Sequence, residues 1–258
     1  MHQGVCKLSI IPLRAEPNGK SEMVSQLLFG ETYQVLDTQT DWVNIKTHTE
    51  DYQGWISRSQ FCDWLGPDLQ MHILNRFPYI EAVNQRNQTR NFLLPGSVIH
   101  KLELGAESSI FYINNDKFIA PIGLADLANL DLNELETYAM QFLNCPYLWG
   151  GKTMWGIDCS GYTQLLYKLM GIQLPRDAWQ QSEGGEVVNF LNEARVGDLA
   201  FFENEEGKIT HVGMLLGPGE ILHASGKVRK DILDSYGIYN STLCKHTHKL
   251  RFIKRFLP

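Results

Sequence analysis

The sequence predicts an α+β protein in which small all-β modules precede a mixed domain. Short strand patterns separated by turns fill the first half of the chain. From about residue 127 the apolar spacing changes to that of helices, and a series of alternating strands follows. A length of 258 residues allows one large domain or two to three small ones. We therefore expect a mixed carboxy-terminal domain with an antiparallel sheet.

The composition is that of a core-forming chain without an excess of positive charge. Hydrophobic residues make up 43%, charged residues 20%, and the net charge is −6. The sequence has no cluster of Lys and Arg, so we expect no nucleic-acid partner. No apolar stretch approaches the roughly 18 residues of a membrane span, so we expect no membrane partner. The first residues do not resemble a secretory signal, and we therefore expect a cytoplasmic protein.

Residues 1–66 show the strand and turn pattern of a small β-barrel. Strands of about five residues recur every 8–12 residues with turn residues between them. The segments LLFGE at 27–31, DWVNI at 41–45 and GWI at 54–56 resemble a bacterial SH3-like domain. This resemblance implies an SH3-like β-barrel over residues 1–66.

Residues 67–126 repeat this pattern more weakly. Possible strands lie at 95–99, 109–113 and 117–122, and the last two flank a turn at Asn114-Asn115-Asp116. We interpret residues 67–126 as a second, degenerate SH3-like domain.

Residues 127–258 are predicted to form the third domain. Residues 130–143 have helical spacing, with Asp131 or Asn133 as the cap, and residues 159–170 form a second helix. Gly171 is a stop signal for that helix. Four strands are predicted after it, at residues 198–202, 210–216, 220–224 and 250–256.

One cysteine stands in a setting suited to nucleophilic catalysis. The chain has five widely spaced cysteines and no C-x-x-C pair, which argues against a disulfide framework and a zinc knuckle. Cys159 lies where a glycine-rich loop enters a helix, and free backbone N–H groups point toward that position. We expect this setting to lower the pKa of the thiol from its usual value of about 8.5.

Two histidines can complete a catalytic group with Cys159. His211 follows 52 residues later on a predicted strand, and His223 lies 12 residues further on the next strand. A short turn between antiparallel strands can bring both side chains within hydrogen-bond reach. The pattern predicts a nucleophile, a base and an orienting residue, although each residue alone would more often be structural.

The motifs DCSG at 158–161, RVGDLAFF at 195–202 and HVG at 211–213 resemble the NlpC family of bacterial cell-wall cysteine peptidases. Together with the SH3-like modules, they resemble the γ-D-glutamyl-L-diamino-acid endopeptidases, also called dipeptidyl-peptidase VI. The resemblance implies a papain-like catalytic domain. It also implies hydrolysis of peptidoglycan stem peptides between γ-D-glutamate and the third, diamino residue, with a free amino-terminal L-Ala required.

The resemblance also implies residue roles. Cys159 is the nucleophile, His211 the general base and acid, and His223 the residue that orients His211. Tyr147 and Trp149 line the groove, and Tyr147 donates to the oxyanion together with the backbone N–H of Cys159. Candidate ligands of the substrate and its free ammonium are Asp158, Ser160, Arg176, Asp177, Tyr52 and Glu22.

Each of these substrate-binding candidates has a structural alternative. Asp158 can simply cap the helix, Arg176-Asp177 can be a surface pair, and Tyr52 can be ordinary barrel packing. Glu22, the weakest candidate, can be a solvated turn residue.

Three classes of function stay open at this point. A secreted hydrolase acting on intact wall and a non-catalytic wall-binding module are alternatives to a peptidase that recycles free murein peptides. His246 and His248 form an H-x-H pair, but with no third ligand at useful spacing we expect no metal site and no cofactor. The sequence determines neither the oligomeric state nor the choice between diaminopimelate and lysine.

Overall fold

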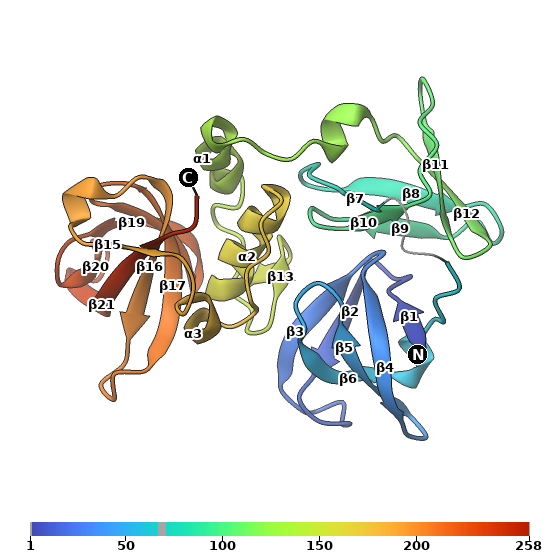
Figure 1. Ribbon diagram of the computed structural model, residues 1–258, viewed down its shortest axis with the longest axis horizontal. Helices are drawn as coiled ribbons and strands as arrows, with labels where there is room; N and C mark the ends of the chain where they lie inside the picture. The colour runs from blue at the N-terminus through green and yellow to red at the C-terminus, as the bar shows by residue number, and fades with distance from the viewer. Residues whose placement is uncertain (1, 67–70, 258) are drawn as a thin grey trace. The chain divides into compact units, whose positions relative to one another are not determined.

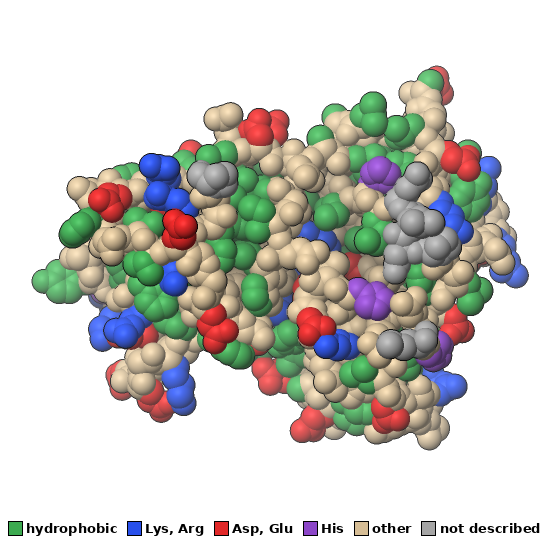
Figure 2. Space-filling model, viewed as in Figure 1, with side chains coloured by type: hydrophobic (Ala, Val, Ile, Leu, Met, Phe, Trp, Pro, Cys, Tyr) green, Lys and Arg blue, Asp and Glu red, His purple; other side chains and the backbone are tan. Residues whose placement is uncertain are grey.

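The computed structural model describes residues 2–66 and 71–257, and it divides into two compact units, Met1–Asn129 and Leu130–Pro258 (Figure 1). Strands make up most of its regular structure, and helices are few and short. Among the described residues, no helix has the length and apolar character needed to cross a bilayer. On the face drawn in Figure 2, acidic and basic side chains are interspersed.

The first unit begins with a six-stranded antiparallel sheet in the order β1-β4-β5-β6-β2-β3. Its elements are β1 (Gln3–Val5), β2 (Ile10–Arg14), β3 (Met23–Leu28), β4 (Thr32–Thr38), β5 (Trp42–Thr47), β6 (Gln53–Ser57) and the 3-10 turn η1 (Arg58–Gln60). Side chains alternate between buried and partly exposed along β5, as expected for a strand with one face on a core. Leu13, Tyr33 and Ile45 are among the fully buried residues of that core.

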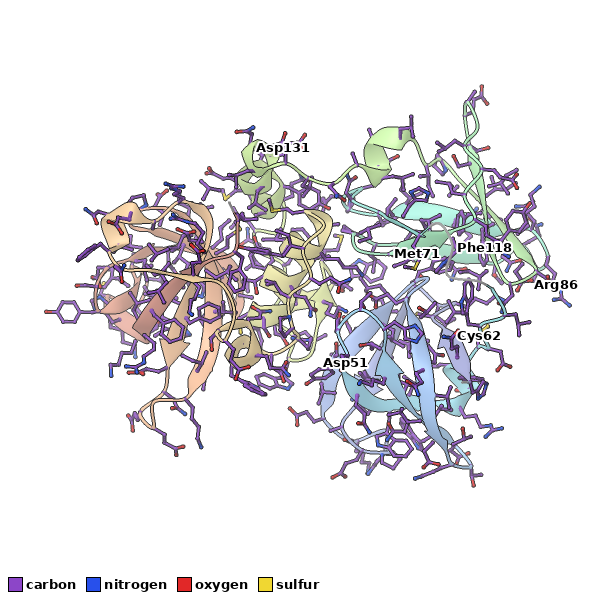
Figure 3. All side chains as sticks on the ribbon, in the orientation of Figure 1. Asp51, Cys62, Met71, Arg86, Phe118 and Asp131 are labelled. Carbon is purple, nitrogen blue, oxygen red and sulfur yellow. The ribbon has the colours of Figure 1, made fainter. Side chains whose placement is uncertain are left out.

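The rest of this unit consists of a two-stranded and a four-stranded antiparallel sheet. Their elements are β7 (Met71–Ile73), β8 (Ile80–Asn84), β9 (Arg90–Leu93), β10 (Val98–His100), β11 (Ser109–Ile113), β12 (Asp116–Ala120) and the 3-10 helix η2 (Leu124–Leu127). Phe118, labelled in Figure 3, packs edge-on against Phe29 with ring centroids 5.4 Å apart. Val5, Phe29 and Trp64 belong to the same apolar cluster as Phe118. Residues 2–66 and 71–129 therefore share a hydrophobic core.

Gly30 shows how closely these two segments pack. Its φ is +78°, and a Cβ there would lie 1.8 Å from the carbonyl oxygen of Val98. The carbonyl oxygen of Gly30 also lies 2.6 Å from His100 Nε2. Only glycine fits this position. The predicted boundary at 66/67 adjoins residues 67–70, which lie outside the described residues, so the division into two domains stays a prediction.

The second unit contains the helices. They are α1 (Leu132–Met140), α2 (Cys159–Leu169), α3 (Ala178–Gln181) and the 3-10 turn η3 (Leu191–Glu193), with a short hairpin of β13 (Lys152–Thr153) and β14 (Gly156–Ile157) before α2. Asp131, labelled in Figure 3, caps α1 by accepting hydrogen bonds from the N–H groups of Asn133 and Glu134, at 2.8 and 3.0 Å. Gly171, at φ +80°, follows the end of α2 as predicted.

The sheet of the second unit is antiparallel and closes on itself. Its strands are β15 (Glu186–Val188), β16 (Val196–Glu203), β17 (Ile209–Gly217), β18 (Glu220–Ser225), β19 (Lys227–Leu233), β20 (Gly237–Asn240) and β21 (Lys245–Arg255). The order is β15-β21-β16-β17-β18-β19-β20, and an additional pairing of β20 with β21 closes a barrel (Figure 1). Every residue of α2 is buried, and the helix contacts β17 and β18. This packing brings the start of α2 to the strands that carry the predicted histidines.

Candidate active site

Cys159 is the first residue of α2 and is 6% exposed. The helix starts there because Asp158 has an extended backbone and its Oδ1 accepts a hydrogen bond from the N–H of Gly161 at 2.7 Å. Gly161 lies against the preceding loop, where a Cβ would approach the carbonyl oxygen of Gly151 to 2.3 Å. The glycine-rich loop and the cap together place the thiol at the amino end of the helix.

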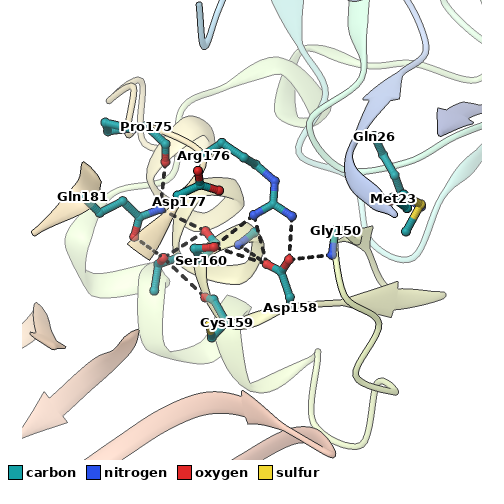
Figure 4. A network of polar contacts seen from close by, with 12 residues as sticks. Met23, Gln26, Gly150, Asp158, Cys159, Ser160, Pro175, Arg176, Asp177 and Gln181 are labelled. Carbon is teal, nitrogen blue, oxygen red and sulfur yellow. Dashed lines mark hydrogen bonds and ion pairs between the residues drawn. The ribbon is translucent and has the colours of Figure 1, made fainter. Parts of the chain in front are cut away.

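A buried ion pair holds the cap in place (Figure 4). Arg176 is 1% exposed and donates to both carboxylate oxygens of Asp158, at 3.1 and 2.6 Å. Asp158 Oδ2 also accepts from the N–H of Gly150 at 2.8 Å, and Arg176 Nη1 donates to Ser160 Oγ at 2.9 Å. The Asp158 carboxylate is therefore saturated with donors from the protein. Asp158 caps the helix, and Arg176 is a buried partner of the cap rather than part of a surface pair.

Gln181 and Asp177 border this network. Gln181 is fully buried, and its Nε2 donates to the carbonyl oxygens of Ser160 and Pro175, at 3.0 and 2.9 Å. Asp177 is the amino-terminal cap residue of α3 and is half-buried. Figure 4 draws its carboxylate beside the network formed by Arg176 and Ser160.

The two predicted histidines are in direct contact across β17 and β18. His211 Nε2 lies 2.8 Å from His223 Nδ1, and the side chains are 6% and 1% exposed. His223 Nε2 lies 3.0 Å from Asp231 Oδ2 on β19, and Arg229 donates to the same carboxylate at 2.6 and 2.8 Å. An ionised carboxylate only accepts, so the proton of His223 sits on Nε2, and its Nδ1 accepts the Nε2 proton of His211. The Nδ1 of His211 then keeps its lone pair.

The thiol lies beside the residue that follows His211. The backbone N–H groups of Val212 and Ser160 hydrogen-bond the Cys159 sulfur and lower its pKa. Burial and the neighbouring charge of Asp158 act more strongly in the opposite direction and raise the pKa of Cys159 to about 12. The expectation of a lowered thiol pKa is therefore wrong for the free protein, because the sequence did not reveal how completely the sulfur is buried.

Burial also determines the charge of the imidazoles. It lowers the pKa of His211 well below its usual value, and the neighbouring His223 and His248 lower it further. Burial likewise lowers the pKa of His223, although the hydrogen bond to Asp231 opposes this. At neutral pH the resting site therefore holds a neutral thiol and neutral imidazoles. Such a pair can act by general-base transfer of the thiol proton at the moment of attack.

The predicted groove residues differ in environment. Burial raises the pKa of Tyr147, and the negative charges that Cys159 and Asp158 can carry raise it further. The hydroxyl of Tyr147 is therefore close enough to interact electrostatically with the thiol of Cys159. Trp149, two residues further on, is 58% exposed.

Glu22 and Tyr52 belong to the other unit, Met1–Asn129. Tyr52 is partly buried against the core of the six-stranded sheet, and Glu22 is exposed just before β3.

Sequence reasoning missed Asp231 and the place of His248. Asp231 lies on β19, a strand that was not predicted. This strand pairs with β18 so that Arg229 lies opposite His223, and Asp231 is two residues further along β19. The only signal was the Arg-x-Asp spacing on alternate strand positions. The His248 ring stacks on His211 with centroids 4.2 Å apart. His246, its sequence neighbour, instead bonds Asp234 at 2.8 Å.

Comparison with known proteins agrees with this geometry. Residues 144–249 match the NlpC/P60 family, and residues 13–61 match the bacterial dipeptidyl-peptidase Sh3 domain. The chain is 30% identical over 242 residues to the gamma-D-glutamyl-L-lysine dipeptidyl-peptidase of Bacillus subtilis (strain 168), covering 85% of this chain and 79% of that protein. The chain therefore belongs to the NlpC/P60 family. It is a cell-wall cysteine peptidase with an amino-terminal SH3 domain.

Two further comparisons support this assignment. A gamma-D-glutamyl-L-lysine dipeptidyl-peptidase of Bacillus cereus (strain ATCC 10987 / NRS 248) is 27% identical over 240 residues, covering 79% of this chain and 68% of that protein. The crystal structure of an NlpC/P60 family protein from Bacillus cereus ATCC 10987 superposes with a TM-score of 0.85, covering 99% of this chain and 100% of that chain, at 20% identity. The second comparison shows the shared fold.

Proposed function

We propose that this peptidase hydrolyses the γ-D-glutamyl–diamino-acid bond of peptidoglycan-derived peptides that carry a free amino-terminal L-Ala. The observation that carries the proposal is the chain of contacts from His211 through His223 to Asp231, together with the hydrogen bond that the N–H of Val212, the residue after His211, gives to the buried Cys159 sulfur. The names of the relatives supply the bond type. A role in recycling free murein peptides in the cytoplasm follows as part of the same proposal.

The reaction proceeds through a thioester. The Nδ1 of His211 takes the thiol proton while the Cys159 sulfur attacks the γ-carbonyl carbon of D-glutamate. The tetrahedral oxyanion accepts hydrogen bonds from the backbone N–H of Cys159 and the hydroxyl of Tyr147. His211 then gives its proton to the leaving amine of the diamino acid, and the C–N bond breaks. Water, deprotonated by His211, hydrolyses the thioester and restores the thiol.

His223 and Asp231 keep His211 in the reactive tautomer. Because Asp231 fixes the proton of His223 on Nε2, His223 Nδ1 accepts from His211 Nε2 and leaves His211 Nδ1 to act as the base. Hydrogen bonds from His223 and Arg229 lower the pKa of Asp231 although burial alone would raise it, so this carboxylate stays ionised at neutral pH.

Recognition of the free ammonium is assigned mainly to Asp177. A buried ammonium needs acceptors or a carboxylate to offset its loss of hydration. The Asp158 carboxylate is paired with Arg176, which also holds Ser160 and the helix start in place, and its role as a ligand of the ammonium stays a prediction. Asp177 adds a second carboxylate beside that network. Tyr52 and Glu22, named as ammonium ligands from their sequence positions alone, stay predictions.

Residues 67–126 are proposed to form a second, degenerate SH3-like domain. Its four-stranded antiparallel sheet and its weak sequence pattern support this assignment.

The test compares four substrates with wild-type protein and with Cys159→Ala. These are L-Ala-γ-D-Glu-meso-diaminopimelate, its L-lysine analogue and the N-acetylated form of each. We expect L-Ala-γ-D-Glu to be released from the free peptides by the wild type alone, with at least about 100-fold lower kcat/KM for the acetylated forms. The Cys145→Ala variant, which removes another thiol of the same unit, should retain activity.

Two results would overturn the proposal. Equal cleavage of free and acetylated peptides, or release of fragments from intact wall, would indicate a wall-cutting hydrolase. Binding to purified wall without turnover of any peptide would indicate a binding module.

A further inference from the structure

A third imidazole joins the two histidines of the candidate active site. His211 on β17, His223 on β18 and His248 on β21 each place one ring nitrogen within 4.8 Å of the others. His248 lies nearly parallel to His211, at an interplanar angle of 26°, and its ring centroid is 5.6 Å from that of His223. The H-x-H pair at 246–248 lacked a third ligand in the sequence. In the folded sheet, whose strands are labelled in Figure 1, His211 and His223 from two other strands join His248 as possible metal ligands.

We propose that His211, His223 and His248 form a binding site for Zn²⁺, and that the bound ion switches the peptidase off. Three histidines with an open fourth position are a common zinc ligand set. Zinc–nitrogen bonds of about 2.1 Å place ligand nitrogens about 3.4 Å apart in a tetrahedral site. His211 Nε2 and His223 Nδ1, now 2.8 Å apart, need to separate slightly to admit the ion, and the His248 ring must rotate out of its stack on His211 so that its in-plane lone pair points at the ion.

The hydrogen bonds around the cluster orient the ligand nitrogens. His223 presents Nδ1 to the cluster because its Nε2 is bound to Asp231 Oδ2, and a carboxylate behind a ligating histidine is a recurrent arrangement in zinc sites. The Oγ1 of Thr247 lies 2.9 Å from His248 Nδ1 and 3.4 Å from the carbonyl oxygen of Ile238. The hydroxyl donates to that carbonyl and accepts the Nδ1 proton. His248 Nε2 therefore keeps its lone pair for a metal ion.

An ion can reach the cluster from solvent. His248 lines an open cavity of about 580 Å³ together with Phe202, Glu203, Asn204, Glu205, Thr210, Thr247 and Lys249. Two glutamates in this wall favour the approach of a cation, although Glu203 is paired with Lys249 at 2.6 Å.

Metal binding removes the base by fixing its tautomer. An ion on His211 Nε2 uses the lone pair of that nitrogen, so the single proton of the neutral ring must move to Nδ1. That nitrogen then cannot accept the thiol proton. The inhibitory part of this inference rests on the proposed role of His211, whereas zinc binding itself does not.

Binding is measured first on Cys159→Ala protein, which lacks the thiol as a competing ligand and turns over no substrate. Calorimetric titration with Zn²⁺ should give one equivalent of tight binding, and Co²⁺ should give the visible bands of a tetrahedral site. Adding His248→Phe, which keeps a ring stacked on His211, should weaken binding at least about 100-fold, and adding Asp231→Asn about 10-fold to 100-fold. The matched control, His246→Phe, should bind like its parent. No saturable equivalent, or equal binding by the His246 and His248 variants, would overturn the site.

Inhibition is measured next on protein with Cys159 intact. Zn²⁺ should inhibit turnover reversibly, with recovery on adding a chelator, and His248→Phe should raise the half-inhibitory concentration at least about 10-fold relative to His246→Phe. Equal zinc sensitivity of the two variants would show that zinc acts at the thiol and His211 alone, and this would overturn the switch. Because the binding arm needs no substrate, failure of the site is distinct from failure of the proposed function.

Discussion

At the residue scale, the contacts of His211 and His223 predict a graded loss of activity. His211→Ala removes the base itself and should lower kcat about 10⁴-fold, the upper end for general acid–base catalysis. His223→Ala leaves His211 in place but removes the hydrogen bond that fixes its tautomer and orientation, so we expect kcat to fall about 100-fold. The measurement is kcat for release of L-Ala-γ-D-Glu, with His246→Ala as an exposed control on the same sheet. Equal losses for the two variants would show that His223 does more than orient.

Asp177 predicts a change in selectivity rather than in chemistry. Asp177→Asn removes the charge that is proposed to bind the substrate ammonium but keeps the size of the side chain. The kcat/KM for the free peptide should fall about 10-fold, while that for the N-acetylated peptide changes little. The ratio of the two values is the readout, and Asp234→Asn, a half-exposed carboxylate of the same unit, is the control. An unchanged ratio would exclude Asp177 as the ammonium ligand.

The sequence could identify the reacting residue types but not their surroundings. Cys159 and His211 belong to recognisable motifs, His223 was predicted from its spacing on the next strand, and the structure brings the two imidazoles together. Asp231 and His248 were out of reach because strand register, not sequence distance, determines their contacts. The thiol pKa was predicted in the wrong direction for a related reason, since burial is a property of the packed helix.

At the element scale, the start of α2 depends on close contact between Gly161 and Gly151. A Cβ at position 161 would approach the carbonyl oxygen of Gly151 to 2.3 Å and Asp158 Oδ1 to 3.0 Å. Gly161→Ala should therefore shift the helix start, lower the free energy of unfolding by about 1–3 kcal/mol and reduce kcat. Urea denaturation and peptide turnover measure the two effects. Gly19→Ala, which meets nothing within 4 Å, should change neither. Wild-type behaviour of both variants would contradict the role of this contact.

Helices and strands were predicted correctly where the apolar spacing of the sequence was clearly that of a helix or of a strand. The helices at 132–140 and 159–169 and the strands β16, β17, β18 and β21 match predicted segments. Strand β19 was missed because it carries many polar residues: Lys227, Arg229, Lys230 and Asp231 occupy most of it. Closure of the sheet by β20 and β21 is a long-range pairing that no local pattern encodes.

For the second unit as a whole, the buried histidines link stability to pH. His211 and His223 have lowered pKa values in the folded protein, and burial lowers the pKa of His248 to about 4. Unfolded, each has a pKa near 6.5, so below that pH the unfolded chain binds protons that the folded chain does not. Stability contributed by these neutral rings is complete above pH 6.5 and is lost as the pH falls toward the folded pKa values.

Between pH 6.5 and 5, proton uptake by His211 of the unfolded chain should lower the free energy of unfolding, because burial keeps the folded ring neutral. We expect the urea midpoint of the second unit to fall steadily over this range in buffer that contains a chelator. His211→Gln removes one buried titrating ring, so its midpoint should fall less steeply with pH whatever its value at pH 7.5. His246→Gln removes an exposed imidazole from the same sheet and should keep the wild-type slope. Parallel curves for all three proteins would mean that the folded site takes up protons as readily as the unfolded chain, and that the imidazoles are not held neutral by burial.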